Sequence, residues 1–115
     1  QINLVFKLMA SAFKNAKLDL TTTGATTLYT APAAKTAIFK SILVSEDSGN
    51  ADTVTATITD ASAAVFSLFK VKAVAANTAV ELLSQPLIVE TGEILKFTAA
   101  TANRLHVVAS YLEVS

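Results

Sequence analysis

The clearest pattern in the sequence is an alternation of apolar and polar residues with the two-residue period of a β-strand. It is most regular over Thr53 to Thr59, where Val54, Ala56 and Ile58 alternate with threonines. Successive side chains of a strand point to opposite faces, so the three apolar residues are expected to face a core and the threonines to face solvent. Arg104 to Val114 shows the same period. We expect one face of this strand to carry Leu105, Val107, Ala109 and Tyr111, and the opposite face to carry His106, Val108, Ser110 and Leu112.

Similar short segments recur along the chain between turn residues. The predicted strands are Thr26 to Thr30, Thr36 to Ser45, Thr53 to Thr59, Ala64 to Val74, Thr78 to Leu83, Leu87 to Glu90, Glu93 to Ala99 and Arg104 to Val114. Pro32, Gly49-Asn50 and Thr91-Gly92 mark breaks or turns between them. About eight short strands are typical of an antiparallel β-sandwich, of the jelly-roll or Ig-like type. Thr36 to Ser45 is apolar on both faces, which indicates a central strand or a face that meets a partner.

Two segments have a less regular pattern. Ala61 to Ala76 could also form a helix, because short apolar runs do not separate the two periods. Ala10 to Ala16 is expected to be a short helical or irregular lead-in. We therefore expect an N-terminal arm or extension over residues 1–16 and a single β-sandwich domain over residues 17–115.

The first eight residues alternate with a strand period of their own. A signal peptide is disfavoured because there is no basic leader and polar residues interrupt the apolar run. The segment is either an extension upstream of a natural start at Met9, or an arm that adds a strand to a neighbouring subunit. The candidate interface residues are Ile2, Leu4, Phe6, Leu8 and Phe13.

Composition narrows the function classes. Hydrophobic residues make up 52% and charged residues 16%, which excludes a disordered chain. Nine basic residues balance nine acidic ones, so no overall field attracts nucleic acid or an anionic membrane. The chain has no cysteine, so it can form neither disulfides nor thiolate metal sites. We expect no nucleic-acid partner and no membrane partner.

The residues that could carry catalysis are few. His106 is the only histidine, and its position within a strand suggests a surface or edge-strand residue. No nucleophile elbow, phosphate loop or dinucleotide motif occurs. The glutamates are expected on solvated faces or at strand ends, where charge protects sheet edges: Glu81, Glu90, Glu93 and Glu113. We expect no enzyme activity, no catalytic residues and no cofactor.

The sequence disfavours two kinds of binding site. Asp47, Asn50 and Asp52 could supply oxygen ligands to calcium, but a plain loop explains the same residues, and we expect no metal. Tyr29 and Tyr111 could offer aromatic platforms to a sugar, but both are flanked by apolar strand residues that favour a core or interface position.

Several stretches resemble a known family. They are Met9 to Asn15, Leu20 to Thr23, Thr26 to Ala33, Ala37 to Ser45, Glu81 to Glu90 with Gly92, and Ser110 to Glu113. Together they resemble small β-sandwich structural proteins of tailed-bacteriophage virions. The likeness covers most of the chain from Met9 onward and is a pattern of strands and turns, without a catalytic signature.

The resemblance implies a structural role in the virion. It implies a capsid cement or decoration protein that stabilises the shell by protein–protein contacts, with the major capsid protein as main partner. Such a protein would be a homo-oligomer, a trimer being favoured, located in the virion after assembly in the host cytoplasm. The alternatives are a small neck or tail protein and a host-glycan-binding β-sandwich module.

Overall fold

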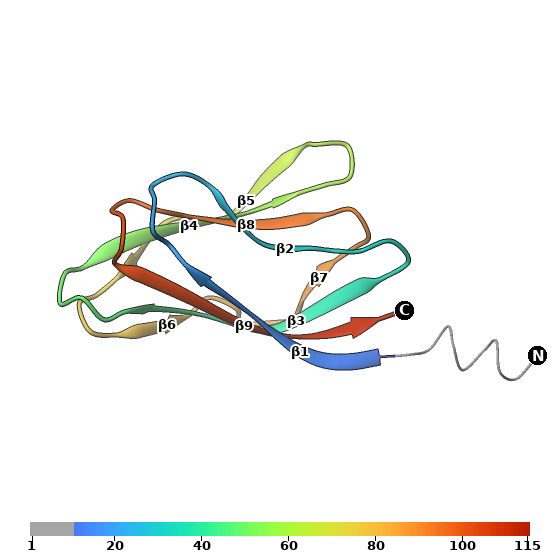
Figure 1. Ribbon diagram of the computed structural model, residues 1–115, viewed down its shortest axis with the longest axis horizontal. Coiled ribbons are helices and arrows are strands. Elements are labelled where there is room, and N and C mark those ends of the chain that lie inside the picture. The colour runs from blue at the N-terminus through green and yellow to red at the C-terminus, as the bar shows by residue number, and fades with distance from the viewer. Residues whose placement is uncertain (1–10) are drawn as a thin grey trace, which may run out of the picture.

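The apolar faces of two antiparallel sheets pack against each other in this protein. The computed structural model describes residues 11–115, which form an all-β sandwich (Figure 1). Its strands are β1 (Ser11–Asp19), β2 (Thr26–Thr30), β3 (Thr36–Glu46), β4 (Asp52–Thr59), β5 (Val65–Val74), β6 (Ala79–Glu81), β7 (Leu87–Val89), β8 (Ile94–Ala99) and β9 (Leu105–Val114). In this range, no helix is long and apolar enough to cross a membrane.

The strand order is that of a jelly roll. Sheet A has the order β1-β9-β3, and the short strands β6 and β7 both pair with the far side of β3. Sheet B has the order β2-β8-β4-β5. Strands early in the chain thus pair with strands late in it, which wraps the chain around the core as in a jelly roll. The β-sandwich prediction is confirmed, and this order selects the jelly-roll type over the Ig-like type.

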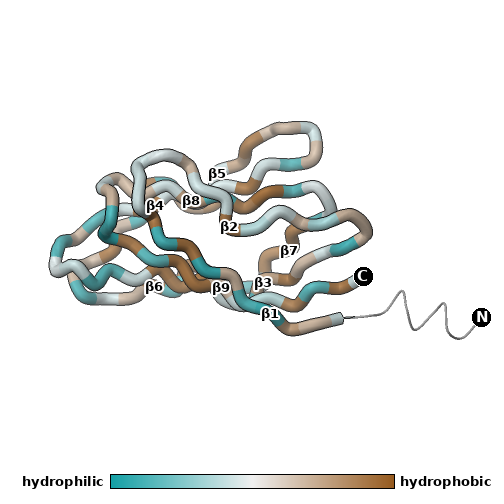
Figure 2. Tube along the Cα trace, in the orientation of Figure 1, coloured by the Kyte–Doolittle hydropathy of each residue, from teal (hydrophilic) through white to brown (hydrophobic). Residues whose placement is uncertain are grey.

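The core is built from the alternation seen in the sequence. The predicted inward residues of β9 are all buried, as are Val54 and Ala56 of β4. Phe39 and Phe97 are the largest fully buried side chains and come from opposite sheets. The alternation of hydrophobic and hydrophilic positions along the strands of sheet A is visible in Figure 2.

One expectation about secondary structure is wrong and one alternative is excluded. Residues 65–74 form β5, which confirms the strand predicted over Ala64 to Val74 and excludes the helical alternative for Ala61 to Ala76. Residues 11–16 are strand and not a helical or irregular lead-in, because they pair with β9 from Ser11 opposite Val114 onward. Of the arm or extension expected over residues 1–16, residues 11–16 are thus part of sheet A. Of the five candidate interface residues, Phe13 lies in β1. Four lie outside the described residues: Ile2, Leu4, Phe6 and Leu8.

The edge strand β5 is irregular. Its register against β4 shifts on both sides of Ala56, so β5 carries extra residues that β4 does not match. Val71 lies in one of these bulges with a φ of 54°, and its N–H donates to the Thr55 hydroxyl at 3.0 Å. A β-branched residue rarely adopts this left-handed conformation, and the strain costs on the order of 1–3 kcal/mol.

The two sheets give a test of the core. We expect Phe97→Ala to lower the free energy of unfolding by about 3–5 kcal/mol, because it removes a fully buried ring and leaves a cavity. Phe66→Ala is the matched control, since its ring is 55% exposed on β5, and should cost about 0.5 kcal/mol. Urea denaturation measures both. Equal losses would contradict this assignment of the core.

Candidate interaction surface on sheet A

The outward side chains of sheet A align into rows that cross the strands. In the first row, Phe13 of β1 is opposite Leu112 of β9, which is opposite Ile38 of β3. Ile38 is in turn opposite Ile88 of β7. Side chains directly opposite each other on one face are close neighbours, so these four form a continuous apolar row.

A second row runs parallel to the apolar row. Lys17 is opposite Val108, and Val108 is opposite Leu43. Leu43 is opposite Glu81 of β6. This charged-end row therefore has two aliphatic side chains in its middle, a cation on β1 and an anion on β6. Between the two rows lies a polar row formed by Asn15, Ser110 and Ser41. The bulge of β3 adds the exposed Lys40 to this face beside Ser41.

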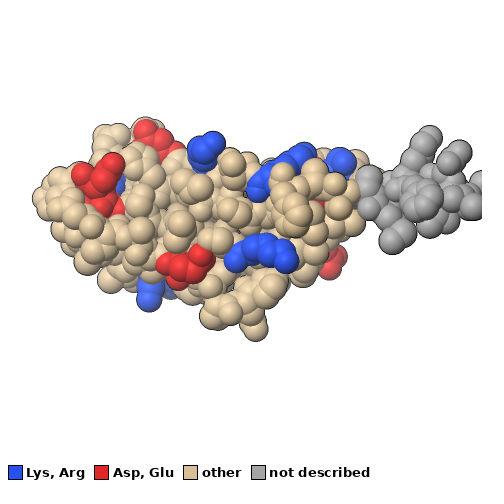
Figure 3. All heavy atoms as spheres, turned by 90° about the horizontal axis from the view of Figure 1, so that it is seen from below, with Lys and Arg blue, Asp and Glu red and all other residues tan. Residues whose placement is uncertain are grey.

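The side chains of this face are unusually exposed for their type. Phe13 is 80% exposed, and Ile88, Leu43 and Val108 are between 40% and 48% exposed. The other large exposed hydrophobics among the described residues, Val65, Phe66 and Val71, are all on β5. Figure 3 looks onto the side of the molecule where sheet A lies and shows scattered charges on a mostly uncharged surface. Apolar groups gathered on one face mark an interaction site more often than chance exposure.

Of the five candidate interface residues from the sequence, Phe13 lies on this face. Five further apolar residues of the two rows lie on the same face, and the sequence analysis did not propose them as interface residues: Leu112, Ile38, Ile88, Val108 and Leu43. For Ile38 and Leu43, the sequence did contain a signal, since the segment of residues 36–45 is apolar on both of its faces. The others became neighbours only through the register of four strands.

Beneath this face, Glu113 is buried between the sheets. Its Oε1 accepts a hydrogen bond from Lys14 Nζ at 2.7 Å, and its Oε2 accepts one from the Tyr29 hydroxyl at 2.7 Å. Glu113 lies at the end of β9, as expected, but it is buried, so the expectation that its charge is solvated and protects a sheet edge is wrong. Alternate residues of β9 face inward, and Glu113 follows Ala109 and Tyr111 in this inward set.

The protonation of this network follows from its contacts. The hydrogen bonds from Lys14 and then from Tyr29 hold the pKa of Glu113 below its ordinary value, although burial opposes this. The Glu113 carboxylate raises the pKa of Lys14. Burial, followed by the hydrogen bond to Glu113, raises the pKa of Tyr29 well above its ordinary value. The network is thus a carboxylate held between a cation and a neutral phenol.

The two tyrosines lie inside the sandwich. Their rings pack on Phe39, with Tyr29 at 5.3 Å and Tyr111 at 4.7 Å between ring centroids. Tyr29 is 8% exposed and Tyr111 is 7% exposed. The expected core position is confirmed, and neither ring is available as a platform for a sugar.

A second buried carboxylate, Glu46, holds the loop after β3. It accepts hydrogen bonds from the Ser48 hydroxyl and from the backbone N–H groups of Ser48, Gly49 and Asn77. These hydrogen bonds, the Ser48 hydroxyl first, lower the pKa of Glu46 to about 2 against the effect of burial. One side chain thereby joins the β3–β4 loop to the loop before β6.

The three residues that could have supplied calcium ligands, Asp47, Asn50 and Asp52, do not point toward a common site. Asp47 lies beside His106, and the Asn50 amide donates to the Ser48 carbonyl at 3.3 Å. Asp52 is buried and accepts from the Thr101 N–H at 3.1 Å. Within residues 11–115, no three acidic or imidazole side chains gather in a way that could hold a metal ion.

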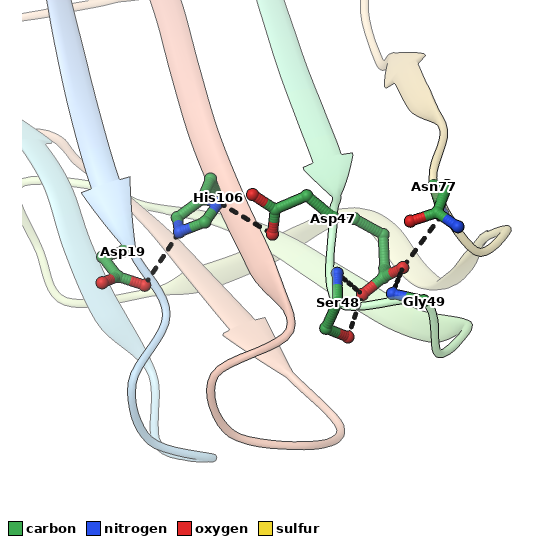
Figure 4. A network of polar contacts seen from close by, with 7 residues as sticks. Asp19, Asp47, Ser48, Gly49, Asn77 and His106 are labelled. Atoms are coloured by element: carbon green, nitrogen blue, oxygen red, sulfur yellow. Dashed lines mark hydrogen bonds and ion pairs between the residues drawn. The ribbon is translucent and has the colours of Figure 1, made fainter.

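His106 has two acidic neighbours that the sequence did not indicate. Its Nε2 lies 3.3 Å from Asp19 Oδ1 and its Nδ1 lies 3.7 Å from Asp47 Oδ1 (Figure 4). Ser45 is opposite His106 on the same face, so serine, histidine and aspartate are adjacent. Both ring nitrogens face carboxylates, which leaves neither directed at the Ser45 hydroxyl as a general base requires.

The edge of the sandwich next to β5 contains a small hollow. It has a volume of about 180 Å³ and lies between β5 and the β6–β7 connection. Its lining includes Leu68, Phe69, Leu83 and Pro86 and no titratable side chain.

No protein-family model matches the chain, and neither does any curated protein.

The buried Glu113 network predicts a specific loss of stability. Tyr29→Phe should lower the free energy of unfolding by about 1.5–3 kcal/mol, because a buried carboxylate loses one donor. Tyr111→Phe is the matched control from the same ring cluster, since no hydrogen bond of its hydroxyl is found within residues 11–115, and should cost about 0.5 kcal/mol. Urea unfolding at pH 7 compares them. Similar losses in both variants would show that the hydrogen bond contributes little.

Glu46 predicts how stability changes in acid. A carboxyl with a lower pKa in the folded state than in the unfolded chain stabilises the fold at neutral pH, and this is lost as pH falls through the folded-state value. Stability should therefore decrease from about pH 5 toward pH 2, the pKa of Glu46 being about 2. Glu46→Gln should be less stable at pH 7, and its difference from the native chain should shrink over this range. Thermal unfolding at a series of pH values measures it. A constant difference would contradict the role of the charge.

Proposed function

We propose that this chain is a non-enzymatic structural subunit of a virion that acts by burying the outer face of sheet A against protein. The observation that carries the proposal is the apolar row of Phe13, Leu112, Ile38 and Ile88 together with the aliphatic centre of the charged-end row. Aliphatic and aromatic side chains ordered on the face of a sheet suit a protein surface of matching shape.

The chemistry of this face favours protein over other partners. Its cations Lys17 and Lys40 are balanced by the anions Asp19 and Glu81, which gives little attraction for phosphate groups or an anionic membrane. The tyrosines that could have stacked on a sugar are buried. Stable interfaces between subunits resemble the interior of a domain, and the apolar row has this composition.

The kind of particle comes from the resemblance to small structural proteins of tailed-phage virions. On that basis we propose a capsid cement or decoration protein that binds the major capsid protein as a homo-oligomer. A neck or tail position is the alternative. The two differ in copy number, since a shell carries hundreds of copies and a neck or tail ring about a dozen or two, as follows from closed symmetry around the particle axis.

Particle association tests the proposal. Purified chain should co-sediment with virions assembled without it, and quantification of the bound chain should give hundreds of copies per particle. Deleting residues 1–8 should weaken association about tenfold or more if this segment is an arm that adds a strand to a neighbour. Circular dichroism should show an unchanged fold.

Val65→Ser on β5 is the control for the association assay, because it alters an exposed apolar side chain on the opposite sheet. Association unaffected by the deletion would argue against the arm. A chain that is absent from purified virions and does not bind them would overturn the proposed function.

A further inference from the structure

We propose that the outer face of sheet A binds the same face of a second copy of this chain, about a two-fold axis parallel to the strands. The inference rests on the proposed function, in which this face is buried against protein, and names the partner. It follows from the order of side chains within the rows.

Consider a line that runs between β9 and β3, parallel to the strands. The apolar row has similar side chains at equal distances on the two sides of this line, and the charged-end row has opposite charges at its two ends. Sheet A presents β1 and β9 on one side of this line, and β3 with β6 and β7 on the other. A two-fold axis along the line turns a second sheet face-down and exchanges the sides. Each side chain then lies over the residue that is equally far from the line in the same row.

For the apolar row, this operation pairs like with like. Phe13 meets Ile88 of the second copy, and Leu112 meets Ile38 of the second copy. Each contact occurs twice, because a two-fold interface is isologous. Phe13 and Ile88 are 80% and 48% exposed in the single chain and would gain most from burial.

For the charged-end row, the operation pairs opposite charges. Lys17 meets Glu81 of the second copy, and Val108 meets Leu43 of the second copy. Two ion pairs thus flank the two aliphatic contacts of this row. In the polar row, Ser41 and the neighbouring Lys40 lie opposite Ser110 of the second copy, whose hydroxyl can accept a hydrogen bond from the lysine. Charges at the edge of a contact favour the correct partner and register.

Other arrangements of the same two faces lose this match. An axis perpendicular to the strands and along the polar row would place Lys17 on Phe13 and Glu81 on Ile88. Each charge would then be removed from water without a partner, which costs free energy. The parallel axis is therefore the one that the side chains support.

Glu81 is held in position for such a pair. Its carboxylate accepts hydrogen bonds from the Ser41 hydroxyl and from the backbone N–H groups of Ile42 and Leu83, at 2.8 and 3.1 Å for the latter two. Burial raises the pKa of Glu81, but these hydrogen bonds together outweigh burial and lower the pKa below its ordinary value, which favours the ionised side chain. A fixed anion loses little conformational entropy when a lysine of the second copy approaches.

Sheets that pack face to face lie about 10 Å apart and are rotated by about 30°, which twisted sheets accommodate. The contact makes a dimer, in place of the trimer that the resemblance implies. A larger homo-oligomer would need a second surface, for which the exposed part of β5 is available.

Sedimentation equilibrium of the full chain tests the inference. The native chain should be a dimer, and Val108→Asp should raise the dimer dissociation constant about 100-fold or more, because it buries an unpaired charge against Leu43 of the second copy. Lys17→Glu should raise it about tenfold at low salt, with a smaller effect in 1 M salt. Val65→Asp and Lys70→Glu on β5 are the matched controls and should leave it within about twofold.

Chemical cross-linking gives a second measurement, should Val108→Asp disturb the fold. The chain has no cysteine, so single cysteines can be placed at will. A mixture of Phe13→Cys and Ile88→Cys chains should be cross-linked by a short bismaleimide more readily than either chain alone, because identical positions in the two copies lie three strand spacings, roughly 14 Å, apart. Equal yields in the mixture and in the separate chains would refute the proposed pairing.

Three outcomes in solution would overturn the inference: a monomer at all concentrations, an oligomer unaffected by Val108→Asp, and an oligomer sensitive only to the β5 variants. A monomer that still binds virions through this face would identify a capsid protein as the occupant, and the proposed function would survive. A dimer with the expected sensitivity that never associates with virions would leave the inference intact and overturn the function.

Discussion

The pairing of β9 with both β1 and β3 determines the rest of this structure. Side chains alternate along β9, so one register sends Leu105, Val107, Ala109 and Tyr111 into the core and their neighbours to the outer face. A slip by one residue would exchange the two sets and destroy both the core and the rows. Glu113 opposes such a slip, because its carboxylate can reach Lys14 and Tyr29 only from the inner side of the strand.

The two buried carboxylates have comparable roles in different parts of the fold. Glu113 joins β1 and β9 of sheet A to β2 of sheet B. Glu46 joins the loop after β3 to the loop before β6 through four hydrogen bonds. Each satisfies donors that would otherwise be left without partners next to the core. Rigid connections of this kind keep sheet A in a fixed shape, which a face that docks on another protein requires.

Local pattern was sufficient to predict most of the fold, but the candidate site depended on long-range pairing. The strands from β2 to β9 lie where alternation and turn residues indicated, including the inward Val54 and Ala56 and the turn at Gly92 with its φ of 83°. The start of β1 was missed because residues 11–16 become a strand only by pairing with β9. The burial of Glu113 and the contacts of His106 were missed for the same reason, since their partners are far away in the sequence. The rows on sheet A combine four strands, and no local window contains them.

The bulged strand β5 bears on how large an assembly of this chain can become. A regular edge strand would present a ladder of free backbone groups, on which further chains could polymerise into fibres. The register shifts of β5, the left-handed Val71 and the flanking Lys70 and Lys72 interrupt that ladder. Growth by edge-to-edge hydrogen bonding is therefore blocked on this side of sheet B. The strain at Val71 is the cost in stability of an edge that does not offer a regular ladder to a further strand.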